Sequence, residues 1–241
     1  MVWSAFIVGS MAPDFPYIVG NMHDRDLGHH LPGLVLFTIP ASFAALWLYH
    51  KVIKRPVIGL MPWGMQARLQ AQAGEFHFGG PARFAAITAS MVLGIASHIV
   101  WDSFTHSFTW AWREIYWLHH RIHIPWLGNV PGFAVAQYGS TLVGMAALAI
   151  WVWLWYRRSV PTADAVQNSP TNSRFPLAIT MFMIAGSVAI ARAVFVVGIP
   201  STRDQADRFF LVFSVTAIAL AFWQLLFYCI LVSACQARTL N

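Results

Sequence analysis

Three long stretches that are almost free of charge constrain the fold of this chain more than any other feature. The one charged residue in them is Arg192, and the stretches are Phe133–Tyr156, Pro176–Gly198 and Phe209–Cys235. A helix that crosses a bilayer needs about 20 mostly apolar residues, so each stretch is long enough to span. Charged residues make up only 10% of the chain and hydrophobic residues 58%, whereas about a quarter of a soluble domain is charged. We therefore expect an all-α, polytopic integral membrane protein, and the composition excludes a disordered chain.

Two further stretches bring the expected number of transmembrane helices to about five. Phe84–Trp101 is long enough to span and has His98 near its end. Leu34–His50 is shorter and contains Pro40, which a membrane helix tolerates where neighbouring groups satisfy the freed backbone. Residues 3–13 are apolar but too short to cross, which is typical of a re-entrant or interfacial segment.

The positions of Lys and Arg predict the orientation of the chain. Nine of the 15 basic residues fall in three regions that a five-span chain places on one side: residues 51–83, residues 157–175 and the C-terminal tail. Because short cytoplasmic loops are rich in Lys and Arg, we expect these regions in the cytoplasm and residues 1–33 and 102–132 on the other face. The net charge of +6 then reflects topology. The basic residues form no stripe of the kind that binds nucleic acid, so we expect no nucleic-acid partner.

The histidines divide the chain into two parts. All ten lie between positions 23 and 123, and residues 133–241 contain none. We interpret residues 1–132 as an N-terminal membrane region that carries the chemistry. Residues 133–241 are expected to be transmembrane anchor helices of the same membrane domain.

The strongest motif is SHIVWDSFTH at residues 97–106, in which His98, Asp102 and His106 recur at intervals of four. On a helix this spacing puts the three side chains along one face, and two ligands four residues apart can bind one metal ion. The outer two are separated by about 12 Å of helical rise, so they do not share one ion on a straight helix. Either the helix bends near Ser103–Thr105, or Asp102 bridges two ions, as in two-metal sites. A purely structural pairing of His with Asp is the alternative.

Two earlier segments offer further ligands. GSMAPDFPY, residues 9–17, presents Asp14 between two prolines that prevent a continuous helix, although ordinary turn chemistry explains the same pattern. DRDLGHHLPG, residues 24–33, puts His29 before the first span and on the same predicted face as His98. Its Asp24 and Asp26 are expected to be solvated loop charges. A mixture of His and carboxylate ligands favours zinc, manganese or iron over calcium, which prefers oxygen alone.

Another histidine pair lies in residues 110–123. His119 and His123 are four positions apart in REIYWLHHRIH, close to Trp110, Trp112 and Trp117. A segment that mixes aromatic and basic residues in this way is typical of an interfacial amphipathic helix, so we interpret it as structural.

Several motifs together resemble a bacterial integral membrane family of unknown function, the domain of unknown function family 4184. They occur in order over residues 4–158 as GSMAPDFPY, GHH, KVIKRP, ASHIVWDSFTH and QYGSTLVG. That family is similar to the membrane-bound metal-dependent hydrolases and, more distantly, to the His-x-x-x-Asp pattern of the zinc phospholipases C. The resemblance implies that the metal ligands are Asp14, His29, His98, Asp102 and His106. Members of the family begin with a Ser/Thr-His segment that is missing before Trp3 here, so either the start is truncated or this member lacks one ligand.

These observations predict a membrane-embedded metal-dependent hydrolase in the bacterial cytoplasmic membrane, with zinc, manganese or iron as its cofactor. Asp14 and Asp102 are the candidate catalytic residues, with membrane lipids as partners. We expect a lipid or lipid-linked ester or phosphoester as substrate at the non-cytoplasmic face, on the basis of location and family analogy. The alternatives are a non-catalytic membrane protein with a structural metal or polar cluster, and a metal or proton transporter.

Overall fold

The computed structural model describes residues 1–18, 28–70, 73–125, 128–161 and 174–238. In chain order its elements are α1 (Trp3–Met11), the 3₁₀ turn η1 (Ala12–Asp14), α2 (Phe15–Ile18), α3 (Leu31–Gly33), the π-helical turn η3 (Leu34–Thr38), α4 (Ile39–Leu48), the π-helical turn η4 (Tyr49–Ile53), α5 (Lys54–Leu60), α6 (Trp63–Leu69), α7 (Pro81–Thr105), α8 (Trp110–Glu114), α9 (Tyr116–His119), β1 (Arg121–Ile124), β2 (Gly128–Pro131), α10 (Gly132–Arg158), α12 (Phe175–Val197) and α13 (Arg203–Arg238). The predicted all-α class is confirmed, with one small hairpin added.

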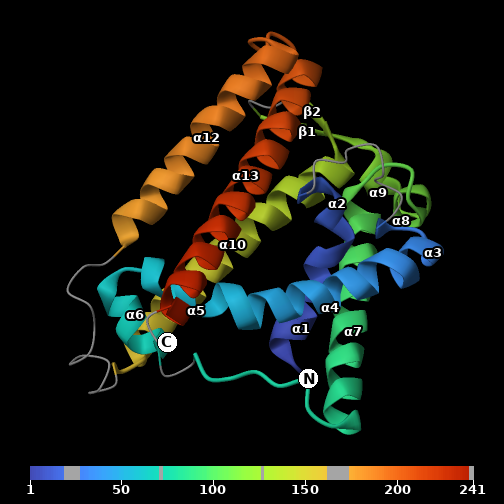
Figure 1. Cartoon of the computed structure of the whole chain (residues 1–241). Helices are drawn as coiled ribbons and strands as arrows, with labels where there is room; N and C mark the ends of the chain where they lie inside the picture. The colour runs from blue at the N-terminus through green and yellow to red at the C-terminus, as the bar shows by residue number, and fades with distance from the viewer. Residues whose placement is uncertain (19–27, 71–72, 126–127, 162–173, 239–241) are drawn as a thin grey trace.

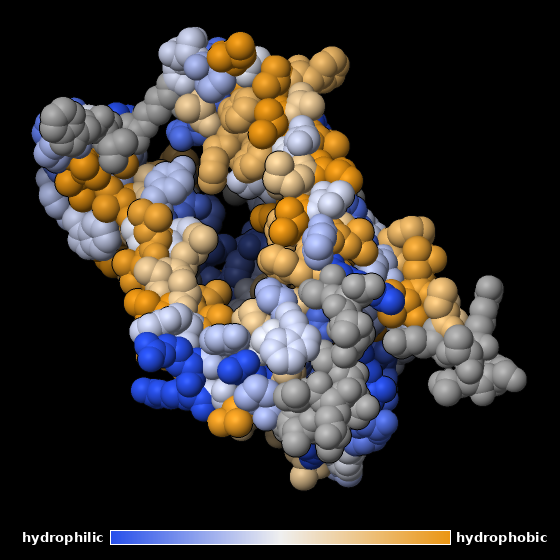
Figure 2. Space-filling view, turned by 90° about the vertical axis from the view of Figure 1, so that its left-hand side faces the viewer, coloured by the Kyte–Doolittle hydropathy of each residue, from blue (hydrophilic) through white to orange (hydrophobic). Residues whose placement is uncertain are grey.

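Five helical segments of the described chain are long and apolar enough to cross a membrane. Each overlaps one of the five predicted spans, and they are Leu31–Leu60, Pro81–Glu114, Gly132–Arg158, Phe175–Val197 and Asp204–Cys235. Most of their side chains point away from the protein interior, and Figure 2 shows apolar side chains over much of one face. An apolar outer surface is stable in contact with lipid chains and costly in contact with water. The chain is therefore a multi-pass membrane protein.

The apolar residues 3–13 form a helix that packs along α7. Glycines make the close approach possible: a side chain on Gly9 would overlap the Met91 carbonyl oxygen, and one on Gly94 would overlap that of Phe6. The Val2 amide also donates to Ser90 Oγ at 2.8 Å. Helix α4 crosses this pair (Figure 1), and the shared core consists of Ala5, Leu46, Ile87, Met91 and Ile95.

The loops fall into two groups at opposite ends of the molecule. At the lower end in Figure 1 lie α5, α6, the start of α7 and the C-terminal end of α13. At the upper end lie α2, α8, α9, the β-hairpin and the connection from α12 to α13. This grouping agrees with the predicted sidedness, except that the N-terminus itself lies in the lower half. The reason is that α1 runs alongside α7 and carries the chain toward the upper end.

The last two helices form a hairpin of their own. They pack through a stripe of small side chains on α12, namely Ala185, Ala189 and Ala193, all of which are buried. Helix α13 also contacts the N-terminal part of the chain, because Trp223 Nε1 donates to the Ile18 carbonyl oxygen at 3.0 Å. The predicted anchor region is thus joined to the part that carries the histidines.

The interpretation of residues 110–123 as one amphipathic helix is wrong. Ile115 adopts an extended conformation that separates α8 from α9, and the chain then enters β1, which pairs antiparallel with β2. The alternating Arg121, Ile122, His123 and Ile124 suit a strand. His119 and His123 consequently lie on different elements and not on one helix face.

Candidate metal centre

The upper end of α7 carries the 97–106 motif. The helix begins after Gly80 with Pro81 in its first turn, which is a favourable position for proline, and it continues for 25 residues to Thr105. His98 and Asp102 are therefore one turn apart on the same face. The predicted alternative of a bend near Ser103–Thr105 is not observed, since the helix ends there and His106 adopts an extended conformation.

His98 is held in one orientation by the backbone of α1. Its Nδ1 atom lies 2.8 Å from the Ser10 carbonyl oxygen, and because a carbonyl only accepts, this nitrogen carries the proton. The other ring nitrogen, Nε2, faces Asp102 Oδ2 at 3.2 Å. It is buried without a hydrogen bond of good geometry, in a side chain that is only 13% exposed. A histidine that ligates a metal is typically fixed in this way.

Asp102 lies at the centre of the cluster. Its Oδ2 atom is 3.2 Å from His98 Nε2 and 3.3 Å from His29 Nε2, while Oδ1 faces His106 Nδ1 at 3.8 Å. The two carboxylate oxygens thus face different histidines. This arrangement agrees with the hypothesis of a bridging carboxylate, and it agrees equally with a hydrogen-bonded His–Asp–His network.

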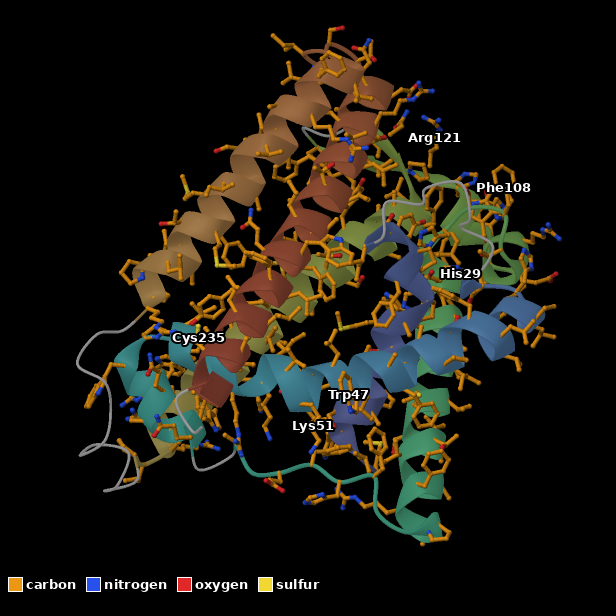
Figure 3. All side chains as sticks on the ribbon, viewed as in Figure 1. His29, Trp47, Lys51, Phe108, Arg121 and Cys235 are labelled. Atoms are coloured by element: carbon orange, nitrogen blue, oxygen red, sulfur yellow. The ribbon has the colours of Figure 1, made fainter. Side chains whose placement is uncertain are left out.

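Asp14 and His29 reach the cluster from two segments that precede α4. Asp14 ends η1 between Pro13 and Pro16, and its Oδ1 atom lies 3.8 Å from His98 Nε2. His29 follows Gly28, where a side chain would overlap the Pro13 carbonyl oxygen, so glycine is what allows the two segments to touch. Figure 3 shows His29 beside the upper end of α7, far from Lys51 and Cys235.

The Asp14 carboxyl is the most accessible group of the cluster, since 53% of its side chain is exposed. Loss of hydration where it is covered raises its pKa above the ordinary carboxyl value, and the His98 ring acts in the opposite direction. His29 and Asp102 are less exposed, at 30% and 23%. Asp14 is consequently the member best placed to meet a molecule from outside.

Three of the predicted ligands form a set that could hold one ion. Asp14, His29 and His98 each offer a ligand atom, and these atoms lie within 4.8 Å of one another. Imidazole nitrogen and carboxylate oxygen together suit zinc, manganese or iron. Ligand bonds to zinc measure about 2.0–2.2 Å, so the three ligand atoms lie somewhat farther apart than they would around a bound ion. The donor types and the fixed orientation of the His98 ring both fit a metal.

His106 stands at the edge of this set. Its side chain is 40% exposed, and its Nδ1 atom contacts Thr105 Oγ1 at 3.3 Å. Among the predicted ligands it faces Asp102, whose Oδ1 atom lies 3.8 Å away. His106 would act as a ligand if a second ion were bound between it and Asp102.

The residues that bring the cluster together were not identified from the sequence. They are Gly9, Gly28 and Gly94, which allow close backbone contact, and Ser10, whose carbonyl oxygen orients His98. The spacing of Gly94 one turn before His98 is a signal that could have pointed to this contact. Asp24 and Asp26 lie outside the described residues.

Five other histidines make contacts outside the cluster, and one of them is His120, whose Nε2 atom lies 3.2 Å from Tyr116 Oη. His119 contacts the Trp112 carbonyl oxygen, and His123 contacts Asn129 Oδ1. His50 bonds to Ser4 Oγ, and His77 is paired with Glu75. None of these contacts reaches one of the five predicted ligands.

A family model, that of the domain of unknown function DUF4184, matches residues 1–230. The chain belongs to this family. The match extends beyond the motif-bearing residues 4–158 and takes in most of α13, so the last two helices are part of the family's common structure. Searches among curated proteins and among solved structures find no match.

Proposed function

We propose that this DUF4184 protein is a metal-dependent hydrolase that acts on a lipid or lipid-linked ester or phosphoester at the non-cytoplasmic edge of the membrane. The single observation that carries the proposal is the contact between His98 Nδ1 and the Ser10 carbonyl oxygen. It fixes the ring so that Nε2 faces Asp102 and Asp14, at 3.2 Å and 3.8 Å, as in a metal-ligating histidine whose other nitrogen donates to a carbonyl oxygen.

Zinc is the proposed cofactor, with manganese or iron as alternatives. Asp14, His29 and His98 would hold one ion, and Asp102 with His106 completes the set of ligands. When bound, such an ion supplies Lewis acidity, which polarises the bond to be cleaved and lowers the pKa of water.

The protein's own groups then have distinct tasks. Asp102 is poorly exposed and contacts His29 and His98, so it orients both rings. Asp14 is the most exposed carboxylate of the set. If Asp102 takes its place as a ligand, Asp14 is instead the candidate to accept a proton from water. General bases must lie within hydrogen-bond reach of the proton that they remove, and the exposure of the Asp14 side chain gives water access to its carboxylate.

The location favours a substrate from the membrane. The loop and helices that follow α7 expose several aromatic side chains, and among them are Phe108 at 73%, Trp110 at 60% and Tyr116 at 66%. Aromatic side chains are typical of the interface between lipid and water. A substrate whose scissile bond lies near the headgroup would reach the cluster without leaving the bilayer.

A structural role for the same residues is the second candidate. The distances of 3.2 and 3.3 Å around Asp102 Oδ2 are short enough for hydrogen bonds from two histidines without an ion. In that case the cluster ties the His29 segment to α7. Transport is less favoured, because a relay needs ionisable groups along the membrane, whereas Arg192 is bonded to Thr216 between α12 and α13.

Metal content and turnover measured on the same preparations separate these candidates. The full chain, its His98→Ala and Asp102→Ala variants and a His77→Ala control would be purified in detergent for elemental analysis. His77 is exposed and paired with Glu75, so its loss should leave both metal and stability unchanged. Fluorogenic ester and phosphodiester lipids in mixed micelles would then serve as substrates.

For a hydrolase, wild type and His77→Ala hold stoichiometric metal and turn over, whereas His98→Ala loses both. Asp102→Ala is expected to lower the rate more than it lowers the melting temperature. If wild type holds no zinc, manganese or iron, the metal-dependent hydrolase is excluded. If it holds metal and a chelator lowers only the melting temperature, with no substrate cleaved, the structural role is established instead.

A further inference from the structure

An apolar groove lies between α6 and α10, at the lower end of the molecule in Figure 1. It has a volume of about 660 Å³, within the range of small-molecule sites, and its lining includes Pro62, Met65, Met145, Leu148, Val152 and Trp153. Several of these side chains remain exposed, with Met145 at 66%, Leu148 at 60% and Trp153 at 54%. The groove is therefore open along its length and almost entirely apolar.

Arginines stand at the end of the groove that is nearest the C-terminus of α10. The Arg68 guanidinium lies 4.2 Å from the centre of the Tyr156 ring, and that of Arg157 lies 5.2 Å from the centre of the Trp153 ring. Tyr156 and Trp153 both line the groove. Stacking on an aromatic ring holds a guanidinium in place and leaves its N–H groups free for an anion.

These arginines have no acidic partner in the part of the chain that the structure describes. The ion pairs found there involve histidines only. Arg68 donates to the carbonyl oxygens of Gly64 and Ser159, which uses two of its five donors. Positive charge at the end of an apolar groove, with unused donors, is complementary to one class of molecule: an acyl chain that carries a phosphate.

We propose that the α6–α10 groove binds an anionic phospholipid. One acyl chain lies along Leu148 and Val152, and the phosphate accepts hydrogen bonds from Arg68 and Arg157. Basic pockets between membrane helices on the cytoplasmic side bind anionic headgroups by this chemistry. Arg68 and Arg157 both fall in the regions that the distribution of basic residues places in the cytoplasm.

This site is separate from the candidate metal centre. Helix α10 has 27 residues and is therefore about 40 Å long. Its first residue, Gly132, follows the β-hairpin at the upper end, whereas the groove lies along its second half. A lipid in the groove belongs to the opposite leaflet from the metal centre and is a bound structural lipid, not the substrate.

The test uses the full chain after removal of loosely held lipid. Phosphatidylglycerol and phosphatidylcholine of identical acyl chains would be titrated separately, and the bound lipid counted by native mass spectrometry. Arg157→Gln removes one phosphate donor, with the exposed Arg121→Gln in β1 as its control. Ala149→Phe fills the groove, because Ala149 lines it, and Ala147→Phe puts the same ring on the other side of α10.

The wild type is expected to bind one phosphatidylglycerol more tightly than phosphatidylcholine. Arg157→Gln should weaken that preference about fivefold, the effect of one basic residue at an anionic surface, and Arg121→Gln should not change it. Ala149→Phe should abolish binding of the lipid, and Ala147→Phe should retain it. Equal affinity for both lipids overturns the proposal. The mass spectra also show whether the chain is a dimer. If Ala149→Phe still binds the lipid but converts a dimer to a monomer, a second copy of the chain fills the groove and the proposal is overturned.

Discussion

His98 Nδ1 lies 2.8 Å from the carbonyl oxygen of Ser10, a residue 88 positions earlier in the chain. This contact connects the packing of α1 on α7 with the chemistry of the candidate centre. The carbonyl oxygen can reach the ring only because Gly94, one turn before His98, lets α1 approach the backbone of α7. The orientation of the His98 ring, and with it the direction in which Nε2 points, thus depends on Gly94, which contributes no ligand atom.

We expect Gly94→Ala to separate the two helices and to weaken metal binding. The added methyl group would overlap the Phe6 carbonyl oxygen and lie 2.8 Å from the Ser10 amide nitrogen. Overpacking of this kind costs about 1–3 kcal/mol. The measurement is the free energy of unfolding in mixed micelles, with metal content determined on the same sample.

Gly144→Ala is the matched control for that experiment. Gly144 lies in α10, and a side chain built there meets no atom within 4 Å. Because alanine favours a helix by about 1 kcal/mol over glycine, this variant should be as stable as wild type or more so. If Gly94→Ala behaves in the same way, the close contact between α1 and α7 does not position His98.

Sequence periodicity predicted the part of the candidate centre that lies on one helix. His98 and Asp102 are four residues apart, and α7 is long enough for that spacing to determine their common face. Asp14 and His29 were placed near them by the predicted sidedness of the loops and by the family resemblance, and not by periodicity. Their actual approach depends on Gly28 and the turn at Pro13. Contact between two loops is decided by backbone sterics, and these produce no periodic pattern in the sequence from which the contact could be predicted.

The five spans were predictable for a different reason, since a bilayer imposes a minimum length on every crossing helix. The hairpin of β1 and β2 was not predictable, because the apolar runs within residues 110–131 are short and their aromatic side chains suit a helix or a strand. The extended conformation of Ile115 and the positive φ of 73° at Gly128 break the segment, and neither follows from hydrophobic pattern.

Gly28→Ala should weaken metal binding while leaving the α1–α7 contact unchanged. The new methyl group would overlap the Pro13 carbonyl oxygen and push the His29 segment away from Asp14. Loss of an orienting contact around a metal typically lowers affinity about 10–100-fold. Competition with a fluorescent zinc chelator would measure the affinity, with Gly59→Ala as control because that site is open. An affinity equal to wild type would show that His29 is not a ligand.

Thr216→Val should destabilise the α12–α13 hairpin more than Arg192→Leu does. Arg192 Nη1 donates to Thr216 Oγ1 at 2.8 Å, and the Thr216 hydroxyl donates in turn to the Val212 carbonyl oxygen. Valine leaves the arginine in an apolar helix without its acceptor, whereas leucine removes the charge that is costly there. Hydrogen bonds between membrane helices contribute about 0.6 kcal/mol on average, so we expect a loss of about 1 kcal/mol for Thr216→Val.

Unfolding in dodecyl sulfate, followed by tryptophan fluorescence, would measure both hairpin variants. Phe195→Leu on the same helix is a suitable control, because Phe195 is 89% exposed and its replacement should be neutral. A larger loss for Arg192→Leu than for Thr216→Val would mean that Arg192 has a further partner, such as a lipid phosphate.

Labelling of engineered cysteines should place the candidate centre on the outer face of the membrane. The native Cys229 and Cys235 are free thiols, so both would first be replaced by serine. His120→Cys, at an exposed position beside the hairpin, is expected to react with a membrane-impermeant maleimide in intact cells. Val160→Cys, exposed to 83% beyond the opposite end of α10, should react only after permeabilisation, because the basic residues near it favour the cytoplasm. The reverse pattern would place Asp14, His98 and Asp102 at the cytoplasmic face, where the substrate would have to come from the inner leaflet.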